Sequence, residues 1–229
     1  MFNSDSQTLK VSVAEDIKLA DVPPGGGPAA QMTSEEREKH EKYTLELTRL
    51  MGRYVTPHNK KSRWVTQEDI TRVLHDAQDM LAMCGLPHGK HNGALAIAHS
   101  QIEDQDPLRF FVLPNGMVVI NPVITNHTKF GQGKEEGCMS FPLESIKKDV
   151  LRYNKVEATY QTLRQIDGEE TPALTGPVSE SLNGRGAQIF QHECGHLNGC
   201  NVYDTDYSPI KSIYMGDGVP ADHPEWIPS

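Results

Sequence analysis

The pattern of hydrophobic and polar positions predicts an amphipathic helix between Thr66 and Cys84. Apolar residues recur there at intervals of three and four, which places them on one face of a helix. Thr66 and Asp69 form the Thr-x-x-Asp pattern of a capping box, which marks the start of the helix. Cys84 continues the apolar face, so we expect its thiol to lie in the core rather than to bind a metal.

Short apolar runs separated by turn residues predict β-strands in the middle of the chain. The runs Phe110–Leu113 and Met117–Ile120 flank an Asn-Gly dipeptide, which favours the positive φ angles of a hairpin turn. Lys155–Leu163 alternates apolar and polar residues, as a half-buried strand does. For residues 171–183 we expect a loop.

The ends of the chain have a different composition from its middle. Residues 23–28 consist of proline and glycine, so we expect residues 1–31 to form a mobile arm. A second capping pattern predicts an additional helix over residues 33–54. The prolines of residues 207–229 predict an extended tail. We therefore expect one catalytic domain over residues 32–206.

The segment Gln191–Asn198 contains the pattern His-Glu-x-x-His. On a helix, His192 and His196 lie one turn apart on the same face, which is the spacing that two ligands of one metal ion require. Glu193 lies about 100° further around the helix, where it can take a proton from water at the metal. Gly199 offers a stop for this helix. Strands followed by such a helix predict an α+β fold, with antiparallel sheets packed around a central helix that carries the motif.

A catalytic site of this type needs a third protein ligand. Val202 stands where one class of metalloprotease has a histidine, and the only downstream glutamate, Glu225, lies in the proline-rich tail. Cys200 lies beyond the expected helix end, about 6 Å further along the axis than the second histidine. Cys138 lies in a polar, glycine-containing segment that can present a thiolate from a bend, so it is the stronger candidate.

Two segments together resemble signature motifs of the peptide deformylase family. Glu136–Ser140, with the sequence Glu-Gly-Cys-Met-Ser, resembles the second motif, and Gln191–Gly199 resembles the third, in the family's order and at a similar separation. Ile120–Pro122 is similar to the family's Asn-Pro strand end, and Val150–Arg152 to its Val-x-Arg segment. The resemblance covers roughly residues 66–204.

The resemblance implies a metal-dependent hydrolase that removes the formyl group from formyl-methionyl peptides and releases formate. The metal ligands that it implies are Cys138, His192 and His196. The family commonly uses ferrous iron, and a donor set of two histidines and one cysteine also suits zinc or nickel. Glu193 would carry the proton to the leaving amine, while the Gln101 side chain and the backbone N–H of Met139 would stabilise the oxyanion.

The first family motif, Gly-x-Gly-x-Ala-Ala-x-Gln, is altered in this chain. When the motif is aligned to end at Gln101, its glycines become Ala94 and Ala96, and its second alanine becomes His99. The motif runs along the substrate in the family, so an alternative function remains, namely that of a related metallo-amidase with a different N-acyl substrate. A non-catalytic module with a structural metal is a third reading, although it would need a fourth protein ligand. We expect His99 to be a surface residue rather than a ligand of a second metal.

Charge and composition limit the partners and the compartment. The net charge of −9 disfavours nucleic acid and anionic membranes, and no run of 18 apolar residues is present. The first thirty residues show neither a signal peptide nor a transit peptide pattern, and a thiolate ligand must stay reduced. We therefore expect a cytoplasmic protein with four unpaired cysteines. The family resemblance implies that its partners are N-formylated peptides, including nascent chains at the ribosome.

Overall fold

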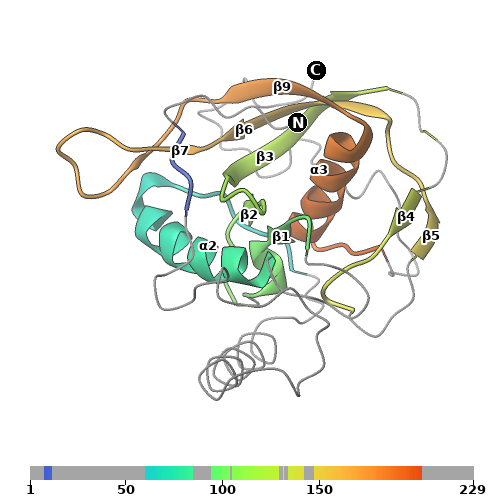
Figure 1. The fold of residues 1–229 in the computed structure, drawn as a ribbon, viewed down its shortest axis with the longest axis horizontal. Helices are drawn as coiled ribbons and strands as arrows, with labels where there is room; N and C mark the ends of the chain where they lie inside the picture. Colours follow the sequence, from blue (N-terminus) through green and yellow to red (C-terminus); the bar gives the residue numbers. More distant parts are fainter. Residues whose placement is uncertain are drawn as a thin grey trace, which may run out of the picture.

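A five-stranded antiparallel sheet with the strand order β1-β2-β3-β6-β9 is the centre of the fold (Figure 1). The computed structural model of the chain describes residues 8–11, 60–84, 94–103, 105–128, 131, 134–141 and 147–202. The strands of this sheet are β1 Ile97–Ala98, β2 Phe110–Val112, β3 Val118–His127, β6 Lys155–Gln161 and β9 Val178–Asn183. Two smaller sheets pair β4 Lys134–Glu136 with β5 Lys147–Val150, and β7 Leu163–Arg164 with β8 Ala173–Leu174.

The helices are α2 Ile70–Cys84 and α3 Gly184–Leu197, and the 3-10 turns are η3 Gln67–Asp69 and η4 His99–Gln101. The prediction of an α+β fold with antiparallel sheets is confirmed.

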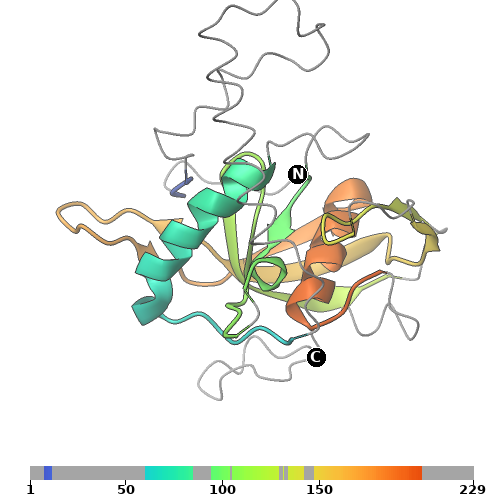
Figure 2. The same cartoon turned by 90° about the horizontal axis from the view of Figure 1, so that it is seen from below.

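The core lies on both faces of β1, β2 and β3. Phe110 and Val112 pack with the apolar face of α2, whereas Phe111 between them packs with Phe190 of α3. The rings of Phe111 and Phe190 meet edge to face, with centroids 5.7 Å apart. Because successive side chains of a strand point to opposite faces, a helix on each side buries all of them. The two helices lie on opposite sides of these strands (Figure 2).

The predicted helix between Thr66 and Cys84 is confirmed, with η3 as its first turn. The backbone N–H of Thr66 donates a hydrogen bond of 2.8 Å to Asp69 Oδ2, which is the interaction that the capping pattern predicts. The Cys84 thiol is buried at the end of α2, and burial raises its pKa to about 12. Cys84 is therefore a core residue, as expected.

The predicted hairpin between β2 and β3 is also confirmed. Gly116 has a φ angle of +80°, and its N–H donates to the carbonyl oxygen of Leu113 at 2.9 Å. A Cβ atom on Gly116 would lie 2.3 Å from the carbonyl oxygen of Val11, so both the turn and this close approach require glycine.

The short segment Thr8–Val11 lies against this hairpin. The N–H of Val11 donates to the carbonyl oxygen of Gly116 at 3.0 Å, and the N–H of Leu9 donates to that of Leu163 at 2.8 Å. Val11 is buried in the core beside α2, so this part of the predicted arm packs against the sheet. The rest of the arm, the predicted helix over residues 33–54 and the predicted tail lie outside the described residues.

β3 is longer than the sequence predicts, because it does not end at the Asn-Pro pair. Its pairing with β6 shifts register between Ile120 and Val123, which accommodates Pro122 inside the strand. Asn121 has a φ angle of +52° and is fully buried. Its side chain accepts from the N–H of Val65 at 2.8 Å and donates to the carbonyl oxygen of Val65 at 2.9 Å. Asn121 therefore ties the segment before α2 to the sheet.

Residues 171–183 form strands, so the loop that we expected there is wrong. β8 lies within this range, and β9 pairs with β6 along its whole length as the edge strand of the large sheet. Leu182 is the one fully buried residue of β9. A polar edge strand has no regular alternation of apolar residues, which explains why the pattern failed.

All four cysteines of the chain lie in the described residues, and all are free, as expected. No helix among the described residues is both long enough and apolar enough to cross a membrane.

Candidate active site

Helix α3, which carries the His-Glu-x-x-His segment, lies between the large sheet and the two-stranded sheet of β4 and β5 (Figure 1). The helix ends as predicted, because Gly199 has a φ angle of +75° and its N–H donates to the carbonyl oxygen of His196 at 2.9 Å. His192 and His196 lie one turn apart, with their Nε2 atoms 3.2 Å apart. The helix therefore directs both imidazoles to one point.

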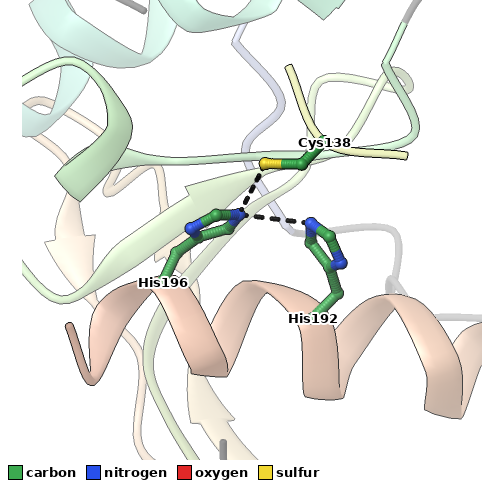
Figure 3. A group of neighbouring side chains, drawn as sticks. All are labelled: Cys138, His192 and His196. Carbon is green, nitrogen blue, oxygen red and sulfur yellow. Dashed lines mark hydrogen bonds between the residues drawn. The ribbon is translucent and has the colours of Figure 1, made fainter. Parts of the chain in front are cut away.

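Cys138, which follows β4, brings its sulfur to the same point (Figure 3). Its Sγ atom lies 3.3 Å from His196 Nε2, and the ligand atoms of Cys138, His192 and His196 all lie within 4.8 Å of one another. Two nitrogens on one tetrahedral ion are about 3.3 Å apart, and a nitrogen and a thiolate sulfur are about 3.5 Å apart, given the usual bond lengths. The two distances to His196 Nε2, from His192 Nε2 and from Cys138 Sγ, are close to these values, and the three side chains form a possible metal site.

The charge state of Cys138 also suits a metal ligand. Burial alone would raise the pKa of its thiol, but the imidazoles of His196 and His192 outweigh this effect and hold the pKa well below its usual range. The thiolate is the form of cysteine that binds metals.

A buried carboxylate orients one of the two histidines. Glu136 Oε2 lies 2.8 Å from Nδ1 of His192, which leaves the Nε2 atom of the ring to face Cys138 and His196. Arg152 donates two hydrogen bonds to the same carboxylate, from Nε to Oε1 at 2.8 Å and from Nη2 to Oε2 at 2.6 Å. Burial would raise the pKa of Glu136, but Arg152 and His192 lower it to about 2, so the carboxylate is charged.

Glu193 is buried beside these groups. Its Oε2 atom has no hydrogen-bond partner among the described residues, whereas almost all buried polar atoms in proteins are paired. Burial raises the pKa of Glu193 above its ordinary value. A carboxylate with a free oxygen and a raised pKa is suited to accept and return a proton.

Gln101 is buried in the turn η4, beside Cys138. Its Oε1 atom accepts from the N–H of Ala98 at 2.8 Å, and its Nε2 atom donates to Ser140 Oγ at 3.1 Å. The same Nε2 atom lies 3.8 Å from Cys138 Sγ. These contacts fix which end of the amide is the nitrogen and direct that nitrogen toward the candidate metal site.

Met139 directly follows Cys138 in a tight turn. The N–H of Phe141 donates to the carbonyl oxygen of Cys138 at 3.0 Å, which closes this turn over Met139 and Ser140. The side chain of Met139 is buried in the core beside α2. The turn therefore holds the Met139 backbone next to Cys138.

Two other residues were weighed from the sequence. Cys200 lies after the end of α3, and its thiol contacts the carbonyl oxygen of Asn198, so the structure does not bring it to the candidate metal site. His99, expected at the surface, is fully buried, because its ring lies between α2 and β2. That expectation is corrected.

Sequence reasoning gave no role to three residues of the site, namely Glu136, Ser140 and Arg152. All three lie within segments that were noted for their resemblance to family motifs. A buried arginine next to a buried glutamate could have been inferred only from the pairing of β4 with β5, which brings residues 134–136 and 147–150 together.

The fold and the candidate site together define an α+β protein with one possible metal site, to which the His-Glu-x-x-His helix contributes both histidines. The family model described as Polypeptide deformylase matches residues 89–211, which is more than half of the chain. The peptide deformylase of Desulfotalea psychrophila is 36% identical over 147 residues, which cover 64% of this chain and 75% of that protein. The crystal structure of peptide deformylase from Thermus thermophilus has a TM-score of 0.50 and 25% sequence identity, over 70% of this chain and 87% of that chain. The chain belongs to the peptide deformylase family, as its motifs predict.

Other relatives match over a shorter part of their length. The peptide deformylases of Thermotoga maritima and Thermotoga sp. strain RQ2 are 37% identical over 110 residues, which is 47% of this chain. The chain spans 59% of the length of these relatives.

Proposed function

We propose that the chain is a metal-dependent hydrolase that removes the formyl group from formyl-methionyl peptides, with release of formate. The observation that carries this proposal is the meeting of Cys138, His192 and His196 within 4.8 Å, next to the unpartnered carboxylate oxygen of Glu193. A structural metal site would have a fourth protein ligand, whereas a catalytic site keeps one position for water or substrate. The group of possible ligands found among the described residues has three members, so the candidate site fits the second description.

We propose that Cys138, His192 and His196 hold one divalent ion, with ferrous iron as the native metal. Zinc and nickel are the alternatives, because two imidazoles and a thiolate suit all three metals. When bound, the ion supplies Lewis acidity, which polarises a carbonyl group and makes water more acidic.

Glu193 acts first as the general base and then as the general acid in the proposed reaction. Its free Oε2 atom accepts a proton from the attacking water and then delivers it to the nitrogen of the leaving amine. Burial keeps this carboxylate away from bulk water, and the raised pKa makes it a stronger base, which favours the uptake of the proton from water.

Gln101 and Met139 stabilise the negative charge that develops on the carbonyl oxygen. Ala98 and Ser140 fix the Gln101 amide so that its nitrogen faces the side of Cys138, and the backbone N–H of Met139 is the second proposed donor. Donors of this kind, held in place before the reaction, each contribute about 10² to 10³ in kcat.

The proposed substrates are N-formylated peptides, including nascent chains at the ribosome. The resemblance to peptide deformylases supports the formyl group, and the need to keep a thiolate ligand reduced supports the cytoplasm as the compartment. We also propose that residues 32–206 form one catalytic domain, to which Thr8–Val11 adds its hydrogen bonds.

A related metallo-amidase with a different N-acyl substrate is the second candidate. It is favoured by Ala94, Ala96 and His99, which differ from the family motif in the segment that leads to Gln101. Larger residues at glycine positions reduce the space next to the backbone, which would alter the fit of the substrate rather than the chemistry at the metal site.

A comparison of two substrates tests the proposal. The chain, with its metal content measured, is incubated with formyl-Met-Ala-Ser and with acetyl-Met-Ala-Ser, and the release of formate and acetate is followed. We expect rapid formate release and at least 100-fold slower acetate release. Acetate release without formate release would favour the second candidate, and no release of either acid from the metal-loaded protein would contradict the proposal.

A further inference from the structure

The turn η4 has few backbone interactions of its own, although it carries Gln101. The N–H groups of Ile102 and Glu103 both donate to the carbonyl oxygen of His99, at 3.0 Å each. A three-residue 3-10 turn of this kind is weak in isolation and depends on contacts with its surroundings. The position of Gln101 therefore depends on what holds the turn.

The side chain of His99 supplies contacts that join η4 to two other elements. Its Nδ1 atom accepts a hydrogen bond of 2.9 Å from the backbone N–H of Leu108, which precedes β2. An Nδ1 atom that accepts carries no proton, so in the neutral ring the proton is on Nε2. That Nε2–H donates to Asp76 Oδ2 on α2 at 3.0 Å, and the ring stacks on Phe110 with centroids 4.7 Å apart.

Asp76 is itself held in place on α2. Its Oδ1 atom lies 2.9 Å from Nδ1 of His75, and its Oδ2 atom lies 3.4 Å from Nε of Arg72. The carboxylate can therefore fix the orientation of the His99 ring, as a carboxylate orients a histidine in other sites.

We propose that His99 is a positioning residue for Gln101, and that Asp76 holds the His99 ring in the orientation this requires. Gln101 is two residues away in the same turn, so a shift of His99 moves the Gln101 amide relative to Cys138 and Ser140. A displacement of about 1 Å at a group that positions the transition state can cost about 100-fold in rate. This inference rests on the proposed role of Gln101 as a donor to the oxyanion.

The test is a double-mutant cycle between His99→Asn and Gln101→Ala. Asparagine at position 99 keeps an acceptor near the N–H of Leu108 but is too short to reach Asp76, so we expect the fold to be retained while the link to α2 is lost. We expect His99→Asn alone to lower kcat about tenfold, with KM and metal content within twofold of the native values. In the Gln101→Ala background, the same change should lower kcat less than twofold, because the group that it positions is gone.

Gln78→Ala is the matched control. Gln78 is an exposed residue of α2, the helix that carries Asp76, and it is not one of the residues that hold Asp76 or His99 in this network, so kcat should stay within twofold of the native value. If His99→Asn does not show cooperative unfolding like the native chain, Asp76→Ala takes its place in the cycle.

The outcomes separate this inference from the proposed function. An equal loss of kcat in both backgrounds, or no loss in either, would overturn the positioning role while the native chain still releases formate. A native chain that releases no formate contradicts the proposed function itself. A loss of metal in His99→Asn would assign to His99 a role at the metal site rather than at Gln101, and would also overturn the inference.

Discussion

Glu136 and His192 are joined by a contact of 2.8 Å between Oε2 and Nδ1, and both groups are largely shielded from solvent. The two residues come from separate parts of the chain, β4 and α3. This contact therefore joins the strand that leads to Cys138 to the helix that carries the histidines. The geometry of the candidate metal site therefore depends on a carboxylate that is not itself a proposed ligand.

Glu136→Gln tests this dependence. The amide keeps the size of the side chain but removes the charge that orients His192, so we expect metal affinity to fall about 10- to 100-fold. Competition with a chromogenic chelator measures the change. Glu135→Gln is the control, since Glu135 is the exposed neighbour on β4, and the prediction is contradicted if both variants bind metal equally well.

Cys138→Ser tests the ligand set. A serine hydroxyl stays protonated at neutral pH and cannot replace the thiolate, so we expect the metal to be lost after dialysis against a chelator. Elemental analysis measures the retained metal. Cys200→Ser should keep its metal, because Cys200 lies outside the cluster of ligand atoms. Full occupancy in Cys138→Ser would remove Cys138 from the proposed ligands.

Glu193→Ala should show the opposite pattern. The metal ligands are unchanged, so we expect native metal content, but kcat for formate release should fall by at least about 10² because the proton carrier is gone. Parallel measurements of metal content and kcat distinguish the two effects. Turnover close to the native rate would exclude Glu193 as the general base.

The interaction between Arg63 and Asp69, just before α2, predicts how the free energy of unfolding depends on pH. The hydrogen bond from Arg63 lowers the pKa of Asp69 to about 2, below the value near 3.9 of an unfolded chain. The stabilisation of the folded state by the ionised Asp69 carboxylate is therefore fully present above about pH 5 and is lost as the pH falls toward 2. Because Arg63 is partly exposed, we expect Asp69→Asn to lower the free energy of unfolding by only about 1 kcal/mol at pH 7.

Urea unfolding of the native chain and of Asp69→Asn between pH 7 and pH 3 measures this difference. The difference in the free energy of unfolding between the native chain and Asp69→Asn should become smaller below about pH 4. Asp167→Asn, in an exposed turn, is the control and should differ little from the native chain at any pH. A gap that stays constant down to pH 3 would contradict the assigned cause.

The sequence predicted those features that depend on local spacing. The two histidines of α3 and the stop at Gly199 follow from helix geometry, and the hairpin follows from its Asn-Gly turn. The sequence also pointed to Cys138, although its approach to α3 depends on the tertiary fold, because the family resemblance links the two motifs. Spacing alone could not have joined residues 58 positions apart.

The failed predictions share a physical cause, which is tertiary context. β9 is an edge strand in which only Val178 and Leu182 are apolar, so its sequence shows no run of alternating apolar residues. β3 continues through Pro122, where Asn121 adopts a positive φ angle next to a register shift. His99 is polar but fully buried, since Asp76 and the N–H of Leu108 satisfy both of its ring nitrogens. Each of these outcomes depends on a partner that lies far away in the sequence.

Titration of metal into the stripped protein tests the central claim most directly. The chain is stripped with a chelator and supplied anaerobically with ferrous iron, and in separate experiments with zinc or nickel, while formate release from formyl-Met-Ala-Ser is recorded. The proposed site, made of Cys138, His192 and His196, predicts that activity rises linearly and reaches its plateau at one metal ion per chain. Formate release that is independent of added metal, or a fully loaded chain that releases no formate, would contradict the account.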